Sequence, residues 1–244
     1  MAVSDTTTSA LTVADRVGTL DWDGLAGELD AQGFAITDRV FSADECRELA
    51  GLFDGDRFRS TIDMARHRFG EGRYRYFAHP LPEPIQEARV ALYARLAPVA
   101  NAWSQRLSGD TPTFPSTHAE LLERCRAAGQ ERPTPLLLRY HEGDWNALHQ
   151  DLYGEVYFPF QAVTVLSDPA EYEGGEFVLM EQRPRAQSRA HVIRPPQGAF
   201  VIFPTRERPN AGKNGYHRIQ LRHGVSTVTA GERTALGIIF HDAR

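Results

Sequence analysis

The chain has 244 residues, of which 41% are hydrophobic and 24% charged, as in ordinary soluble globular proteins. This length is enough for one domain with a substantial core. The formal net charge is −5, so the field of the whole protein gives no support for binding a polyanion. Any basic binding site would therefore be confined to a local patch.

The cysteines and the N-terminal residues bear on the cellular compartment. Cys46 and Cys125 lie in helix-like segments without a second cysteine or a histidine at metal spacing, which disfavours a disulfide framework and a cysteine-based zinc site. Residues 1–10 lack the basic and apolar regions of a secretory signal, and no run is long enough to span a bilayer. We therefore expect a cytoplasmic protein with free thiols and no membrane contact.

The N-terminal part of the chain predicts a flexible polar tail over residues 1–15, followed by a helical support and lid region over residues 16–133. A short amphipathic helix is expected over residues 22–30, closed by Gly33. Alternating apolar residues predict a strand over residues 34–37.

Three further helices follow in this region. Ser42 and Glu45 fit a capping box, in which the serine hydroxyl accepts from the N3 amide and the glutamate reaches back, and the helix that they open runs through Phe53. Apolar residues recur every three and four positions over residues 84–107, which predicts the longest helix. Another helix is expected over residues 118–128.

After Pro135 the sequence changes to short apolar runs separated by turns rich in Gly and Pro, which is typical of strands. Strands are expected over residues 136–140, 156–166, 176–181, 190–194, 199–203, 219–229 and 234–241. Helices first and many short strands afterwards favour one α+β domain over residues 16–244, with a β-sandwich or jelly-roll core in residues 134–244.

His149 and Asp151 form the pair of residues that first suggests chemistry. In a strand, residues i and i+2 point to the same face, so both side chains can converge on one point. A third ligand from another strand would complete a set of two histidines and one carboxylate. This set suits Fe(II) and leaves three coordination positions open.

His223 is the best third ligand, because a tight turn at Gly231 and a returning strand can bring Arg233, ten residues later, close to it. The planar fork of an arginine is suited to hold a distal carboxylate by two parallel hydrogen bonds. The main competitor is His217, and weaker candidates are His191 and His241.

Three stretches around these positions carry a recognisable pattern. They are residues 138–151, Gly174-Gly175-Glu176-Phe177 and residues 222–233. They resemble the Fe(II)/2-oxoglutarate dioxygenases of the prolyl-4-hydroxylase type, over roughly residues 134–243. The ending over residues 236–243 is especially similar to a bacterial subgroup of that superfamily. The resemblance implies a double-stranded β-helix, which is a jelly roll, with helices packed on its outer face.

The resemblance also implies a role for each matching position. His149, Asp151 and His223 would bind iron. Arg233 would hold the C5 carboxylate of 2-oxoglutarate, and Tyr140 would donate to the same carboxylate. Such an enzyme uses O2, with ascorbate as a possible reductant, and releases succinate and CO2. Since Asp151 is an intact carboxylate, where related halogenases have a small residue, the pattern favours hydroxylation.

Residues 57–77 interleave arginines with aromatic side chains inside a stretch, residues 54–82, that has no clean period. We expect a long, partly ordered excursion, and a loop of that length is often functional. It is either a solvated basic loop anchored by its aromatic residues or a substrate lid that attracts an anion and stacks a planar group. As a lid it would contact the substrate through Arg66, Tyr74 and Tyr76.

Two further side chains have open roles. Trp145 precedes His149 and either lies at the rim of the site or plugs the edge of the barrel. Gln161 is the one uncharged amide of an apolar strand. It faces either solvent or the interior, where a bound cosubstrate would be a partner for it.

Three functions are compatible with this pattern. The leading one is an oxidoreductase that hydroxylates a small molecule, an amino acid or a peptidyl residue, and an anionic substrate is expected only if residues 57–77 form a lid. The alternative is an oxidative demethylase of alkylated nucleic acid, in which residues 57–77 cover an extruded base, although the acidic net charge argues against it. A non-catalytic jelly-roll binding or sensor protein is the third, against which the complete ligand set argues. A monomer and a homodimer are both compatible.

Overall fold

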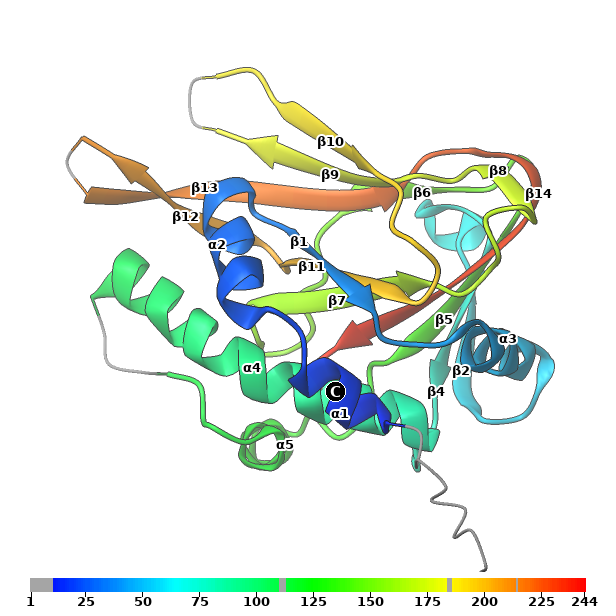
Figure 1. Ribbon diagram of the computed structural model, residues 1–244, viewed down its shortest axis with the longest axis horizontal. Coiled ribbons are helices and arrows are strands. Elements are labelled where there is room, and N and C mark those ends of the chain that lie inside the picture. The colour runs from blue at the N-terminus through cyan, green and yellow to red at the C-terminus, as the bar shows by residue number, and fades with distance from the viewer. Residues whose placement is uncertain (1–10, 110–112, 184–185, 214) are drawn as a thin grey trace, which may run out of the picture.

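Two antiparallel sheets face each other in the computed structural model, which describes residues 11–109, 113–183, 186–213 and 215–244 (Figure 1). The larger sheet has eight strands: β1 (Ala35–Arg39), β11 (Ala199–Pro204), β7 (Phe160–Val165), β14 (Val228–Ile239), β5 (Leu136–His141), β4 (Arg73–Phe77) and β2 (Phe58–Asp63) in spatial order, with β8 (Tyr172–Gly174) paired to β14. The smaller sheet has six: β10 (Arg189–Ile193), β9 (Phe177–Gln182), β13 (Gly215–Val225), β6 (Trp145–His149) and β3 (Gly70–Glu71), with β12 (Glu207–Gly212) paired to β13. This confirms the expected α+β fold with a jelly-roll core.

The helices lie outside this core. They are α1 (Val13–Gly18), α2 (Trp22–Gln32), α3 (Ala43–Gly51), α4 (Glu83–Ser108) and α5 (His118–Ala127), with short 3-10 turns η1 (Leu52–Asp54) and η2 (Ala65–His67). The predicted caps are present: Ser42 and Glu45 form a capping box, and Gly33 ends α2 in the left-handed conformation. No helix among these described residues is long and apolar enough to cross a membrane.

The central strands of the larger sheet are buried on both faces, because α4 covers one face and the smaller sheet covers the other (Figure 1). Strand β11 shows this arrangement, since all of its six residues are buried. Phe200 and Ile202 pack in the cluster under the helices, whereas Val201 and Phe203 pack between the sheets. Alternate side chains of a strand point to opposite faces, so an uninterrupted apolar run is what a doubly covered strand needs.

The segment predicted as a long excursion is instead a set of strands. Residues 58–77 contain β2, β3 and β4, and β4 extends the larger sheet by pairing with β5. The short β3 pairs with β6 of the smaller sheet, with Gly70 opposite Asn146. A Cβ on Gly70 would lie 2.2 Å from the carbonyl oxygen of Trp145, and φ is +121° there. The prediction of irregular structure was wrong. The sequence of β4, Arg-Tyr-Arg-Tyr-Phe, does alternate as a strand does, but β5 and β6, with which β4 and β3 pair, lie far away in the chain.

Several predicted boundaries also differ. The strand expected over residues 219–229 is two strands, because β13 ends at Val225 and β14 begins at Val228. The turn therefore precedes Gly231, which lies inside β14 with φ of +77°, where a Cβ would be 2.0 Å from the carbonyl oxygen of Glu171 on the adjoining segment. Strand β7 begins only at Phe160, after Pro159.

At the N-terminus, α1 begins at Val13, inside the segment expected to be a tail. Thr12 and Asp15 form a second capping box, which supplies partners for the first amides of this helix. Of the expected tail, residues 1–10 lie outside the described residues.

Candidate metal and cosubstrate site

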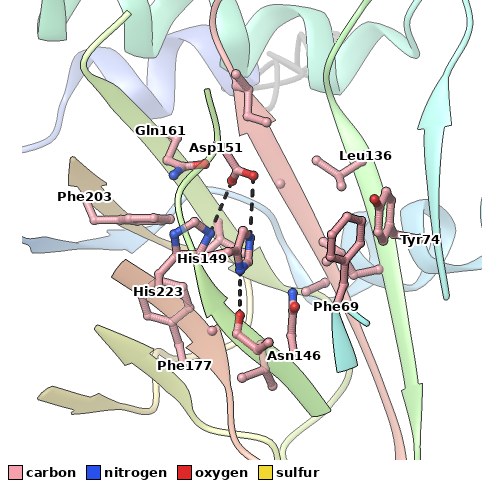
Figure 2. A pocket seen from close by; sticks show the side chains of 18 of the residues that line it. Phe69, Tyr74, Leu136, Asn146, His149, Asp151, Gln161, Phe177, Phe203 and His223 are labelled. Carbon is pink, nitrogen blue, oxygen red and sulfur yellow. Dashed lines mark hydrogen bonds and ion pairs between the residues drawn. The ribbon is translucent and has the colours of Figure 1, made fainter. Parts of the chain in front are cut away.

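Two strands of the smaller sheet bring His149, Asp151 and His223 together (Figure 2). His149 is the last residue of β6, and its direct cross-strand partner is His223 of β13. Asp151 lies two residues further, just beyond the strand, so that one ligand atom of each residue lies within 4.8 Å of the others. It is the one group of at least three such side chains with this spacing among the described residues.

The hydrogen bonds of His149 fix which of its nitrogens faces the centre of the group. Its Nδ1 lies 2.7 Å from the carbonyl oxygen of Ala147, which can only accept, so Nδ1 donates. In the neutral ring, Nε2 then carries a lone pair, and it lies 3.5 Å from Asp151 Oδ1. A backbone carbonyl that orients a histidine in this way is the usual support of a metal ligand.

The charges of the group favour the ligand forms of all three residues. Burial alone would raise the pKa of Asp151. The hydrogen bond and the charge of His223, the charge of His149 and the hydrogen bond from Tyr153 together hold the pKa below its usual value. Burial and the neighbouring His149 lower the pKa of His223, against the opposing effect of Asp151. A carboxylate and neutral imidazoles are the protonation states that metal binding requires.

Aromatic side chains fix the His223 ring. Phe203 lies 4.8 Å from it, centroid to centroid, and Phe177 is stacked at 5.9 Å, with the two phenyl rings themselves 4.8 Å apart (Figure 2). Both rings come from strands that face the interior, one from each sheet. The imidazole is therefore held in place by packing as well as by Asp151.

A cavity of about 270 Å³ opens beside the three residues and is lined by Arg233, Tyr140 and Gln161. Arg233 is only 1% exposed, and its Nε and Nη1 have no hydrogen-bond partner within the part of the chain that the structure describes. Tyr140 lies directly opposite on β5, with the guanidinium carbon 5.7 Å from its ring centroid. Buried donors without partners are costly unless a ligand satisfies them.

The chemistry of this cavity fits a dicarboxylate with one end at Arg233. Burial lowers the pKa of Arg233 and raises the pKa of Tyr140 to about 12, so the tyrosine stays a neutral donor. Gln161 is buried and faces the cavity, and its Nε2 has no partner among the described residues, which decides between its two predicted orientations in favour of the interior. Asn146, which with Trp145 precedes His149 and was expected at the rim of the site, lines the cavity and donates to the Tyr140 hydroxyl at 3.3 Å.

The predicted substrate contacts divide into two groups. Tyr74 and Tyr76 of β4 line the cavity, and so does Phe69, on the side opposite to Gln161 (Figure 2). Arg66 and Trp145 do not line it. The Arg66 side chain is 82% exposed and lies 3.9 Å from Asp63, while Trp145 is 41% exposed at the start of β6.

The remaining histidines considered as ligands have other surroundings. His217 lies on the exposed β12–β13 hairpin and its Nε2 contacts Asn210 at 3.2 Å. His191 packs edge-on against Phe34, and His241 accepts from the backbone amide of Phe158 at 3.1 Å. The structure thus brings His223, and not His217, to the His149–Asp151 pair.

Comparisons with known proteins agree with this geometry. A family model described as "Oxygenase, catalysing oxidative methylation of damaged DNA" matches residues 72–243. Uncharacterized proteins from two strains of Mycobacterium tuberculosis are 50% identical over 168 residues, which is 68% of this chain and 72% of theirs.

Solved structures share the fold at low sequence identity. A prolyl 4-hydroxylase of Pseudomonas putida has a TM-score of 0.54 at 17% identity, over 91% of this chain and 99% of that one. A prolyl hydroxylase of Trichoplax adhaerens, in complex with a hypoxia inducible factor peptide, has a TM-score of 0.54 at 15% identity, over 91% and 89%. A 2-oxoglutarate–Fe(II) oxygenase of Burkholderia pseudomallei has a TM-score of 0.51 at 18% identity, over 91% of each chain. The chain therefore belongs to an oxygenase family and has the fold of the prolyl-4-hydroxylase-like 2-oxoglutarate–Fe(II) oxygenases.

Proposed function

We propose that the protein is a dioxygenase that uses Fe(II), 2-oxoglutarate and O2 to hydroxylate a C–H bond of its substrate. In the balanced reaction, one oxygen atom enters the substrate as a hydroxyl group, and the other enters the succinate that forms when 2-oxoglutarate loses CO2. The observation that carries the proposal is the buried guanidinium of Arg233, with two unpartnered nitrogens, in the same cavity as the two histidines and Asp151.

Each residue of the site has a task in this reaction. His149, Asp151 and His223 would hold the iron through one face and leave three positions open. Bound iron supplies the activation of O2 that the protein side chains cannot provide. Arg233 would hold the distal carboxylate of 2-oxoglutarate by charge-assisted hydrogen bonds, with Tyr140 and Gln161 as neutral donors.

Uncoupled turnover tests this function without knowledge of the substrate. The protein, mixed anaerobically with Fe(II) and 2-oxoglutarate, is expected to develop a weak visible charge-transfer band. On exposure to air, with ascorbate as reductant, it is expected to release succinate. The absence of the band under all conditions would contradict the proposal, whatever the substrate is.

A second candidate concerns the substrate, which the family description favours as nucleic acid. The exposed residues 66–69 support it, because Arg66 and Arg68 lie beside His67 and Phe69 in the sequence, and the rings of His67 and Phe69 are stacked with centroids 5.5 Å apart. Phe69 also lines the cavity, so a base could stack where it enters. Hydroxylation of an N-methyl group gives a hydroxymethyl group that leaves as formaldehyde, which would make the protein a demethylase.

Single-stranded DNA that carries methylated bases distinguishes this candidate from hydroxylation of a small molecule or a peptide. A demethylase is expected to release formaldehyde together with succinate and to bind the DNA more weakly as salt rises. The double variant Arg66→Gln/Arg73→Gln should weaken binding, whereas Arg47→Gln, an exposed arginine on α3, should not. Succinate without formaldehyde, together with equal binding by both variants, would favour a small-molecule or peptidyl substrate.

A further inference from the structure

The carboxylate of Asp151 is held by a chain of two phenol hydroxyl groups that no catalytic role yet explains. Tyr153 donates to Asp151 Oδ1 at 2.8 Å, and Tyr76 donates to the Tyr153 hydroxyl at 3.1 Å. The other carboxylate oxygen, Oδ2, lies 3.3 Å from His223 Nε2. The two oxygens of Asp151 therefore have different surroundings: Oδ1 accepts from Tyr153 and also lies 3.5 Å from His149 Nε2, whereas Oδ2 faces His223 Nε2.

Both tyrosines are anchored by contacts away from the cavity. The backbone carbonyl of Tyr153 accepts from Gln130 Nε2 at 3.2 Å, which fixes the segment that follows the ligand. Tyr76 is buried on β4, and the guanidinium carbon of Arg59 lies 4.6 Å from the centroid of its ring. Arg59 in turn donates to the carbonyl oxygen of Pro133 at 3.0 Å. The hydroxyl chain thus connects Asp151 to a rigid strand of the larger sheet.

We infer that Tyr153, held by Tyr76, is a positioning residue that reserves Asp151 Oδ2 for the metal and keeps the carboxylate from binding through both oxygens. The inference rests on the proposed function. A carboxylate can bind a cation through one or both oxygens, and the second mode takes an additional coordination position. With one oxygen engaged by Tyr153, three positions stay open, two for 2-oxoglutarate and one for O2.

Metal binding without turnover tests the role of Tyr153. Mn(II) affinity is measured by electron paramagnetic resonance on the wild type and on Tyr153→Phe, Tyr76→Phe and the double variant. Loss of a partner outside the ligand set typically weakens metal binding about 10- to 100-fold, so we expect at least about a tenfold higher Kd for Tyr153→Phe. Tyr76→Phe should raise it less. The double variant should match Tyr153→Phe, because Tyr76 acts through Tyr153.

A second readout separates positioning from a general effect on the fold. The charge-transfer band of the Fe(II)–2-oxoglutarate complex should shift in Tyr153→Phe, because the geometry of Asp151 changes, but not in Tyr157→Phe. Tyr157 is a matched control on the same segment, exposed and outside the cavity. If Tyr153→Phe does not fold, the test rests on Tyr76→Phe. A Kd for Mn(II) and a charge-transfer band equal to those of the wild type in Tyr76→Phe would then overturn the inference.

The result for the wild type keeps the two proposals apart. A wild-type protein that binds neither Mn(II) nor Fe(II) with 2-oxoglutarate would overturn the proposed function. A wild-type protein that binds both, beside a folded Tyr153→Phe with the same Kd and band, would overturn only the role of Tyr153. Additive losses in the double variant would also overturn it, since they would show that Tyr76 acts independently.

Discussion

His149 and His223 are direct cross-strand partners on β6 and β13, with ring centroids 4.2 Å apart. The pairing places two imidazoles on the interior face of the smaller sheet at a separation that one cation can bridge. Directly paired residues of an antiparallel ladder have adjacent side chains, so the distance between the rings is set by the backbone register. A shift of that register by one residue would turn one ring out of the site.

Removing the second imidazole should therefore abolish the metal site without unfolding the sheet. We expect His223→Ala to lose the charge-transfer band with Fe(II) and 2-oxoglutarate, and to lose succinate release by at least about 100-fold, because two ligands hold iron poorly. His217→Ala, an exposed histidine of the same strand, should keep both. Spectrophotometric titration with Fe(II) measures the difference. A band that disappears in His217→Ala and persists in His223→Ala would contradict the assignment.

Replacing Arg233 should weaken the binding of the cosubstrate without destabilising the protein that has no ligand bound. Because two of its buried nitrogens have no partner in the described part of the chain, we expect Arg233→Gln to leave the melting temperature without ligand unchanged or higher. The same variant should raise the KM for 2-oxoglutarate by about 10- to 100-fold, since a hydrogen bond to a charged group contributes about 1.5–3 kcal/mol.

Two measurements check this prediction for Arg233. Calorimetry with and without 2-oxoglutarate should show that the ligand raises the melting temperature of the wild type and much less that of Arg233→Gln. Tyr140→Phe, which removes one neutral donor, should have a smaller effect on KM than Arg233→Gln. An unchanged KM in Arg233→Gln would exclude this arginine as the carboxylate partner.

The positions of the site could be predicted from the sequence where they depend on short-range backbone geometry. The two-residue spacing of His149 and Asp151 places both side chains on one side of a strand end, even though β6 stops at His149. His223 and Arg233, ten residues apart, line one cavity, but not through a strand that returns beside β13. The turn lies before Gly231, and β13 and β14 belong to different sheets, so the two side chains face the cavity from opposite sides of the jelly roll.

Features that depend on distant partners could not be predicted in the same way. The strand β4 pairs with β5, about sixty residues later in the chain, and its alternating sequence Arg-Tyr-Arg-Tyr-Phe marks a strand without indicating that partner. Tyr153 stands two residues after Asp151, but only the fold shows that its hydroxyl reaches the carboxylate and that Tyr76 supports it. The inward orientation of Gln161 was equally undecided until both neighbours of β7 were known.

Gly70 should be required for the contact between β3 and β6. A methyl group there would meet the carbonyl oxygen of Trp145 at 2.2 Å, which is backbone and cannot move aside cheaply. We expect Gly70→Ala to lower the free energy of unfolding by about 1–3 kcal/mol, as for a residue forced into a sparsely populated conformation. Urea denaturation measures the change.

Gly129→Ala is the matched control for Gly70→Ala. Gly129 also has positive φ, +73°, but nothing lies within 4 Å of its added Cβ. Gly129→Ala should lower the free energy of unfolding by only about 1–2 kcal/mol, the penalty of the left-handed conformation, and leave the cavity intact. Succinate release should therefore fall in Gly70→Ala, which displaces the adjacent, cavity-lining Phe69, and stay unchanged in Gly129→Ala. Equal activity in the two variants would show that the β3–β6 contact is dispensable.

His118 should make the fold sensitive to mild acid. Burial, and then the charge of Arg89, lower the pKa of His118 from 6.5 to about 3 in the folded protein, where its Nε2 lies 2.8 Å from the carbonyl oxygen of Phe240. In the unfolded chain, His118 therefore binds a proton near pH 6.5, whereas in the folded chain it stays neutral at that pH. The stabilisation is fully present above that pH and is lost as pH falls towards 3. Between pH 7.5 and 5.5 this histidine should reduce the free energy of unfolding by about 1.4 kcal/mol, one pH unit of linkage.

The variant His118→Gln tests this prediction. Glutamine can keep the hydrogen bond without titrating, so urea denaturation should show a smaller loss of the free energy of unfolding over the same pH interval. His241, whose pKa burial lowers to about 4, adds a similar loss in both proteins and leaves their difference unaffected. An identical loss in the variant and the wild type would exclude His118 as the source.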